Sequence, residues 1–171
     1  MATQGAATRR PLVAVCGGST PRPTDLAAAR EVGRLCAERG WTVLCGGGGG
    51  VMGAVAEGVR AAGGLVIGLL PGTDPAAGHW ALSVALPTGL GEGRNWLLVR
   101  AASGVIAVGG GTGTLSELAL ALSIGRPTAA IGSWRLHAPD GREGAALGLQ
   151  AHPDPASAVA WMAGQLESDA L

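Results

Sequence analysis

The sequence contains no phenylalanine, no tyrosine and no lysine. Aromatic side chains are limited to five tryptophans, so we expect a core built mainly from alanine, valine and leucine. Without a lysine, the chain cannot hold pyridoxal phosphate as an internal aldimine. The absence of lysine therefore excludes pyridoxal-dependent decarboxylation of amino acids.

Charge and cysteine are also scarce. The 12 basic and 12 acidic residues give a net charge of zero, so we expect no nucleic-acid partner and instead expect a small molecule. The three cysteines form no CxxC pair and the three histidines stand alone, which predicts no metal site and is typical of the reducing cytoplasm. No apolar run approaches the ~18 residues of a transmembrane helix, so no membrane segment is expected.

Glycine, in contrast, is abundant. The 31 glycines in 171 residues exceed the usual share of about 7% more than twofold. They have no collagen-like period and lie between strongly apolar runs, which favours clustered turns over disorder. The length is that of one domain, so we expect a flexible segment over residues 1–10 and a single nucleotide-binding domain over 11–171.

Short apolar runs alternate with helical patterns along the chain. The expected strands are 12–16, 41–45, 65–70, 82–86, 105–108 and 128–131. The expected helices are one capped by Asp25 and ended by Gly40, followed by 51–62, 91–102, 114–124 and 153–166, and 134–148 is expected to be a loop. Strands that alternate with helices predict an α/β fold with a mostly parallel sheet and right-handed crossovers.

Three glycine clusters follow expected strands, at 17–19, 46–50 and 109–113. Open parallel sheets bind ligands beyond the carboxyl ends of their strands, where these turns lie. Free backbone amides at the start of a helix bind phosphate without any cationic side chain, and glycine lets the anion approach the backbone. The turns therefore predict a site for a nucleotide or another phosphorylated small molecule.

Residues Gly48 to Gly53 also match GxGxxG, with Asp74 about 20 residues further on, a pattern typical of dinucleotide-binding turns. Asp74, however, follows the Pro71-Gly72 turn instead of ending the preceding strand. A run of five glycines also matches this pattern easily by chance. A dinucleotide is therefore the weaker of the two interpretations.

The two longest glycine motifs resemble those of the LOG (Lonely Guy) family. Residues 46–53 read GGGGGVMG and residues 109–117 read GGGTGTLSE, against family signatures of the form GGGxxGxM and PGGxGTxxE. The resemblance extends from Val13 to about Ile131. It implies a Rossmann-like three-layer sandwich, a homodimer or higher homo-oligomer, and cofactor-independent cleavage of the N-glycosidic bond of nucleoside 5′-monophosphates.

The resemblance also implies roles for individual residues. Arg94 and Glu117 match the catalytic pair, and Met52 is expected near the base. The implied ligand- and phosphate-binding residues are Gly17, Gly18, Ser19, Gly47, Gly48, Met52, Asn95, Gly110, Gly111, Thr112, Gly113 and Thr114. Two positions depart from the hydrolases: Gly109 replaces a proline, and Asn95 replaces the lysine that follows the arginine. These departures bring the chain closer to a LOG-like branch that includes molybdenum-cofactor carrier proteins.

Glu117 has two possible roles. Its carboxylate could stabilise an oxocarbenium-like state and activate water, while Arg94 holds the phosphate or ribose or orients Glu117 by a forked hydrogen bond. Alternatively, Thr114-Leu-Ser-Glu117 is a capping box in which Glu117 satisfies backbone donors. The following stretch, 118–122, is apolar on every face, which predicts burial in the core or against a second subunit.

The leading hypothesis is therefore a cytoplasmic nucleoside 5′-monophosphate phosphoribohydrolase that releases free base and ribose 5-phosphate. The alternative is a non-catalytic carrier or sensor of a phosphorylated cofactor such as the molybdenum cofactor. Release of free base from AMP, CMP, GMP or UMP distinguishes the two.

Overall fold

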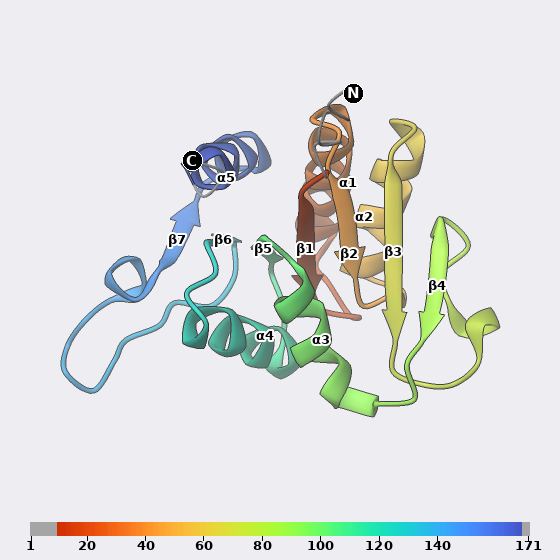
Figure 1. Cartoon of the computed structure of the whole chain (residues 1–171). Helices are drawn as coiled ribbons and strands as arrows, with labels where there is room; N and C mark the ends of the chain where they lie inside the picture. Colours follow the sequence, from red (N-terminus) through yellow and green to blue (C-terminus); the bar gives the residue numbers. More distant parts are fainter. Residues whose placement is uncertain (1–9, 169–171) are drawn as a thin grey trace, which may run out of the picture.

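The chain folds into a seven-stranded sheet and five α-helices within residues 10–168, which are the residues that the computed structural model describes (Figure 1). The strands are β1 (Leu12–Gly17), β2 (Thr42–Cys45), β3 (Leu65–Leu70), β4 (Val84–Pro87), β5 (Gly104–Val108), β6 (Thr128–Ile131) and β7 (Leu149–His152). The α-helices are α1 (Pro23–Glu38), α2 (Val51–Ala61), α3 (Arg94–Ala101), α4 (Thr112–Ser123) and α5 (Pro155–Ser168), and the short 3-10 helices are η1 (Pro75–Ala77), η2 (Gly91–Gly93) and η3 (Gly144–Leu147). Apart from Arg10, the expected flexible segment 1–10 lies outside the described residues.

The sheet is parallel throughout, with strand order β4-β3-β2-β1-β5-β6-β7. From the central β1 the chain extends outward through β2, β3 and β4, and then returns to place β5 on the free edge of β1. Gly17 at the end of β1 pairs with Val108 at the end of β5. This reversal is the topological switch point at which open parallel sheets bind ligands.

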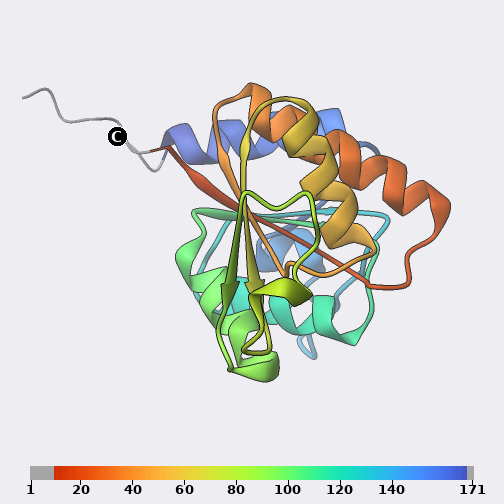
Figure 2. The same ribbon diagram turned by 90° about the vertical axis from the view of Figure 1, so that its right-hand side faces the viewer.

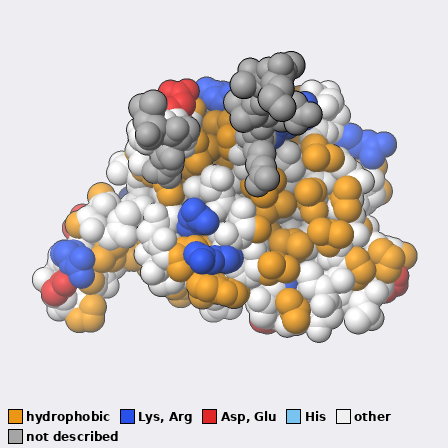
Figure 3. All heavy atoms as spheres, in the orientation of Figure 1, with side chains coloured by type: hydrophobic (Ala, Val, Ile, Leu, Met, Phe, Trp, Pro, Cys, Tyr) orange, Lys and Arg blue, Asp and Glu red, His pale blue; other side chains and the backbone are white. Residues whose placement is uncertain are grey.

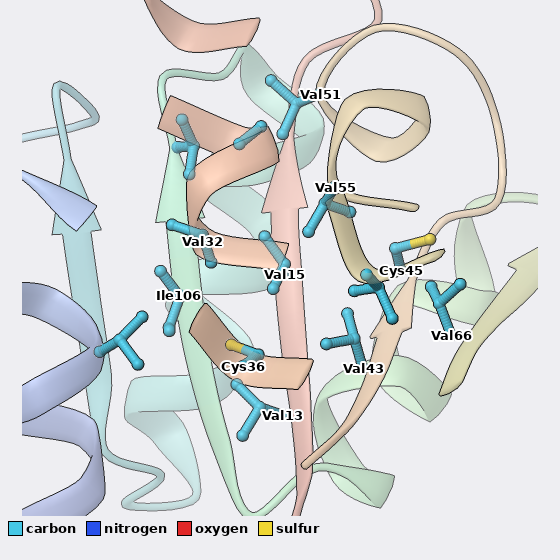
Figure 4. Packing of buried hydrophobic residues seen from close by; sticks show 14 of the residues in the cluster. Val13, Val15, Val32, Cys36, Val43, Cys45, Val51, Val55, Val66 and Ile106 are labelled. Atoms are coloured by element: carbon cyan, nitrogen blue, oxygen red, sulfur yellow. The ribbon is translucent and has the colours of Figure 1, made fainter. Parts of the chain in front are cut away.

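Helices cover both faces of the sheet and give three layers (Figure 2). On one face α1, α2 and α5 bury a valine-rich cluster that includes Val13, Val15 and Val43 (Figure 4). Alternate residues of β1, Ala14 and Cys16, point to the other face, against α3 and α4, as the two-residue period of a strand requires. The Rossmann-like three-layer sandwich is therefore confirmed. Within residues 10–168, no helix combines the length and the apolar character that a membrane crossing needs.

Several element boundaries differ from the sequence predictions. The sequence does not predict β7, because its four residues, LQAH, carry little hydrophobic pattern, and pairing with β6 defines the strand. Helix α1 begins at Pro23, so Asp25 is not the cap residue and instead accepts the backbone N–H of Arg22 at 3.1 Å. Helix α4 begins at Thr112 rather than Thr114, since Gly113 is tolerated in a first turn whose amides make no intrahelical bonds. The expected helix 91–102 is divided into η2 and α3.

Candidate functional site

A cavity of about 740 Å³ lies beyond the carboxyl ends of β1 and β5, at the switch point. The residues predicted from the sequence that line it are Gly17, Gly18, Ser19, Met52, Arg94, Asn95, Gly110, Gly111, Thr112, Gly113, Thr114 and Glu117. The structure thus brings together residues from the β1–α1 turn, α2, α3 and the β5–α4 turn. Gly47 and Gly48 do not line the cavity, and their turn contributes Gly46 instead. Gly47 packs against Leu70 of β3.

The first turn of α4 forms one wall of the cavity. The first hydrogen bond into the helix runs from the N–H of Leu115 to the carbonyl of Gly111 at 3.1 Å. The amides of Thr112, Gly113 and Thr114 precede it, and at this position in a helix they lack intrahelical acceptors and carry partial positive charge. Because these three residues line the cavity, the helix start can bind an anion there.

The β1–α1 turn lies against this helix start. A Cβ added to Gly18 would be 3.6 Å from the Cα of Gly110, so the two turns touch without side chains between them. The carbonyl of Gly18 accepts the backbone N–H of Val51, which also ties the first turn to the start of α2 at 3.0 Å. Three loops from separate parts of the sequence therefore hold one another in place around the cavity.

Glu117 is a buried carboxyl group in the cavity wall, only 7% exposed. Burial raises its pKa to about 7, although the thiol of Cys16 and the charge of Arg94 act in the opposite direction. Burial and the neighbouring Glu117 raise the pKa of Cys16 well above its usual value, so the thiol stays protonated and can donate to the carboxylate. The helix itself is capped at Gly111 without a side-chain hydrogen bond, so the capping-box interpretation of Glu117 is wrong.

Arg94, the first residue of α3, also lines the cavity. Its Nη1 donates to the backbone carbonyl of Gly46 and, at 2.6 Å, to that of Leu69. No hydrogen bond joins Arg94 to Glu117 within the described part of the chain, so the expected forked contact is not formed. The guanidinium thus joins the turn after β2 to the end of β3 through hydrogen bonds. Its charge lowers the pKa of Glu117.

Asn95 occupies the position where the hydrolases carry a lysine. It is 4% exposed, and its amide nitrogen donates to the hydroxyl of Ser116 at 3.0 Å. Its Oδ1 is buried and has no hydrogen-bond partner among the described residues. Asn95 therefore ties α3 to α4, and its Oδ1 is buried beside the cavity wall without a partner among the described residues.

Two further groups line the cavity that sequence reasoning missed. Arg22 forms an ion pair with the buried Asp25 at 2.8 Å and also donates to the carbonyl of Gly132 at 3.1 Å. These hydrogen bonds with Arg22 lower the pKa of Asp25. The pair connects the β1–α1 loop to the loop after β6.

The loop after β6 supplies the second missed group. The indole nitrogen of Trp134 donates to the carbonyl of Gly111 at 3.0 Å, and the hydroxyl of Ser133 donates to that of Gly109. Both residues and Arg135 line the cavity. The rule that placed the glycine turns at the carboxyl edge of the sheet, applied to the residues after strand 128–131, could have found them.

Asp74, the acidic residue of the dinucleotide pattern, does not join the cavity. Asp74 lies before η1, where its carboxylate accepts the N–H of Ala76 at 2.8 Å, and it does not line the cavity. Among residues 10–168, no group of three or more histidine, cysteine, aspartate or glutamate side chains is placed to hold a metal ion.

The fold and the cavity define a Rossmann-like α/β protein whose candidate site combines the backbone amides of a helix start with a buried carboxyl group. The chain belongs to the SLOG cluster4 family, whose model matches residues 10–154. The resemblance to the LOG family is thereby confirmed, and the solved structures described next are similar to its molybdenum-cofactor carrier branch.

Two solved structures are similar over nearly the whole chain. The molybdenum cofactor binding protein of Rippkaea orientalis is 32% identical, with a TM-score of 0.83, over 92% of this chain and 98% of that one. The molybdenum cofactor carrier protein of Chlamydomonas reinhardtii is 30% identical, with a TM-score of 0.79, over 93% of this chain and 99% of that one.

A further relative is named as a phosphoribohydrolase. The cytokinin riboside 5′-monophosphate phosphoribohydrolase of Mycobacterium tuberculosis is 36% identical over 107 residues, which are 60% of this chain. The matched region spans 57% of the length of that relative.

Proposed function

We propose that this protein is a carrier that binds a phosphorylated cofactor of the molybdenum-cofactor kind by its phosphate, at the β5–α4 turn. The observation that carries the proposal is the wall of unpaired backbone amides at the start of α4, which lines a cavity large enough for a whole cofactor. The likeness to two molybdenum-cofactor proteins over more than nine tenths of the chain supports it.

The side chains of the cavity suit binding better than hydrolysis. The guanidinium of Arg94 is held by two carbonyls, and Asn95 offers a neutral amide where a lysine would offer a charge. Arg94 keeps its positive charge near Glu117, but its Nη1 is engaged by the carbonyls of Gly46 and Leu69. The phosphate is therefore held by the backbone, and the molybdenum travels as cargo on the cofactor.

The test is to incubate the purified protein with molybdenum cofactor under anaerobic conditions, remove free cofactor by gel filtration, and measure the pterin and molybdenum retained. We expect both to be retained with the wild-type chain. We expect both to be lost with Gly113→Ala, which places a methyl group in the anion pocket, and retained with Gly164→Ala in α5, where a Cβ likewise meets nothing within 4 Å. Equal retention by the two variants would contradict the proposed site.

The second candidate is a nucleoside 5′-monophosphate phosphoribohydrolase. It is favoured by Glu117, because a carboxyl group with a pKa of about 7 is partly ionised at neutral pH and can accept a proton from water in the same cavity. Incubation with AMP, CMP, GMP and UMP tests it. Release of free base that is lost in Glu117→Gln supports hydrolysis, whereas retained cofactor without base release supports the carrier.

We also propose that the protein is a homodimer. Val84 and Leu86 of β4 are 41% and 44% exposed, and their register with Ile67 and Leu69 places them on the face of the sheet that α3 and α4 cover only in part. Hydrophobic side chains gather on this face over β3 and β4 (Figure 3). Leu65 and Leu97 add to the patch, so a second copy can bury it.

We also propose that the protein is located in the cytoplasm. Cys16, Cys36 and Cys45 are unpaired and buried. Unpaired cysteines are typical of proteins in reducing compartments.

A further inference from the structure

The cavity has two unlike ends on either side of the anion pocket. Met52, Arg94 and Glu92 line the end near β2, whereas Trp134 and Arg135 line the end near β6. The β1–α1 and β5–α4 turns lie between them, since the strand order in this region is β2-β1-β5-β6. A ligand whose phosphate sits at the start of α4 can therefore extend toward either end.

At the end near β2, side-chain atoms crowd the glycine turn that follows the strand. The sulfur of Met52 and the guanidinium of Arg94 both crowd Gly46, where an added Cβ would be 2.5 Å from the sulfur. The carboxylate of Glu92 adds negative charge at this end and helps to raise the pKa of Glu117. This end therefore carries one guanidinium and one carboxylate, and none of these three lining residues is aromatic.

The end near β6 offers an aromatic surface instead. Trp134 is 38% exposed, and it is the tryptophan that lines the cavity. Its Nε1–H is fixed by the carbonyl of Gly111, the residue immediately before α4. The indole is thus held beside the anion pocket with part of its surface accessible, the arrangement in which an aromatic side chain stacks on a planar ring.

Arg135 follows Trp134 in the chain and also lines the cavity. Its side chain makes no hydrogen bond or ion pair with any residue from 10 to 168, unlike the other two arginines of the cavity, Arg22 and Arg94. A guanidinium donates two parallel hydrogen bonds to a carbonyl oxygen and a neighbouring ring nitrogen, as it does to guanine. Arg135 is therefore free to recognise the edge of an oxygen-bearing ring.

We propose that Trp134 and Arg135 form a ring-binding subsite for a planar heterocycle that carries a carbonyl group, of the guanine or pterin type, joined to the phosphate held by α4. This inference rests on the proposed phosphate site. It places the ring near β6, away from Met52, the residue that the family resemblance puts near the base.

The test compares three ligands by calorimetric titration. GMP carries the phosphate and a carbonyl-bearing ring, AMP carries a ring without that carbonyl, and ribose 5-phosphate carries no ring. We expect Trp134→Ala to lower the affinity for GMP and for AMP about 5- to 100-fold, which is the range of one lost stacking contact. We expect the affinity for ribose 5-phosphate to change less than about twofold. We expect Trp134→Phe to restore most of the affinity, because it keeps an aromatic face.

Arg135→Ala tests the edge contact separately. We expect the wild-type chain to bind GMP more tightly than AMP, and Arg135→Ala to reduce this preference by about fivefold or more. The matched control is Trp80→Ala, since Trp80 is 69% exposed and packs against Arg60 away from the cavity. We expect Trp80→Ala to leave the affinities for all three ligands unchanged.

Fluorescence gives an independent readout. GMP is expected to quench the tryptophan emission of the wild-type chain and of Trp80→Phe, and not that of Trp134→Phe. The ring subsite is overturned if Trp134→Ala lowers the affinity for all three ligands equally, or if it leaves the affinity for GMP unchanged. Either result leaves the phosphate site in place. A wild-type chain that binds none of the three overturns the proposed function itself.

Discussion

The carboxylate of Asp25 lies directly against the backbone of Gly109. A Cβ added to Gly109 would meet Oδ2 of Asp25 at 2.7 Å, and Gly109 has a φ of +55°, a conformation that proline cannot adopt. The glycine that replaces the proline of the LOG signature is therefore required by the conformation that this turn adopts. The carboxylate that Arg22 holds occupies the space behind the turn.

Substitution of Gly109 is expected to destabilise the protein in a graded way. Gly109→Ala is expected to cost about 1–3 kcal/mol of unfolding free energy for its strained φ. Gly109→Pro is expected to cost at least about 1 kcal/mol more, because it also loses the hydrogen bond to the carbonyl of Ile131 at 3.0 Å. Urea unfolding measures both, and a proline variant as stable as wild type would show that the positive φ is not needed.

Gly113→Ala is expected to separate stability from binding. The residue is in the first turn of α4, and an added Cβ meets no protein atom within 4 Å, so the unfolding free energy is expected to stay within about 1 kcal/mol of wild type. The methyl group would occupy the anion pocket, so affinity for ribose 5-phosphate is expected to fall at least about tenfold. Calorimetry and urea unfolding on Gly113→Ala and Gly164→Ala check this, and loss of binding in both variants would count against it.

Glu117 is expected to make stability depend on pH. Its pKa in the folded chain is about 7, against an ordinary 4.5, so folding is penalised as pH rises through this interval and the full penalty is present above it. Glu117→Gln removes the ionisable group. Its stability relative to wild type is expected to rise by up to about 3 kcal/mol between pH 4.5 and pH 8. Unfolding curves at a series of pH values measure the difference, and parallel pH profiles for the two proteins would rule out the raised pKa.

Arg94 is expected to act on both the backbone and Glu117. Arg94→Met removes every side-chain donor and leaves the carbonyls of Gly46 and Leu69 without a partner, which is expected to cost about 1–3 kcal/mol. Because the charge of Arg94 lowers the pKa of Glu117, the variant should raise that pKa further. Arg94→Lys keeps the charge and serves as the control. The pH dependence of unfolding measures the pKa, and an equal value in the two variants would contradict the electrostatic role.

The exposed patch on β4 is expected to hold two copies together. Leu86→Glu places a charge at its centre and is expected to convert a dimer to a monomer in light scattering coupled to gel filtration. Trp80→Glu is the control, because Trp80 packs against Arg60 of α2, on the opposite layer. A wild-type monomer at micromolar concentration would remove the proposed dimer.

The sequence predicts the sheet and the place of the glycine turns at its carboxyl edge because both depend on local patterns: apolar runs, and glycine turns that follow them. It does not predict β7, whose residues Gln150 and His152 carry no strand pattern and are defined by pairing with β6. Nor does it predict that Asp25, Trp134 and Arg135 join the site, since none belongs to a glycine motif. The capping box at Glu117 failed for a related reason, because helix α4 begins at Thr112 and the carboxyl group is buried beside Cys16.

The strand order links occupancy of the cavity to the integrity of the whole sheet. β1 and β5 are neighbours in the sheet although the strands β2, β3 and β4 and the helices α1, α2 and α3 separate them along the chain. A molecule seated across their turns touches both halves and recognises only the assembled protein, so its binding free energy opposes their separation. Binding of such a molecule is thus expected to raise the melting temperature, and any partner that separates the two halves would release the bound molecule in the same step.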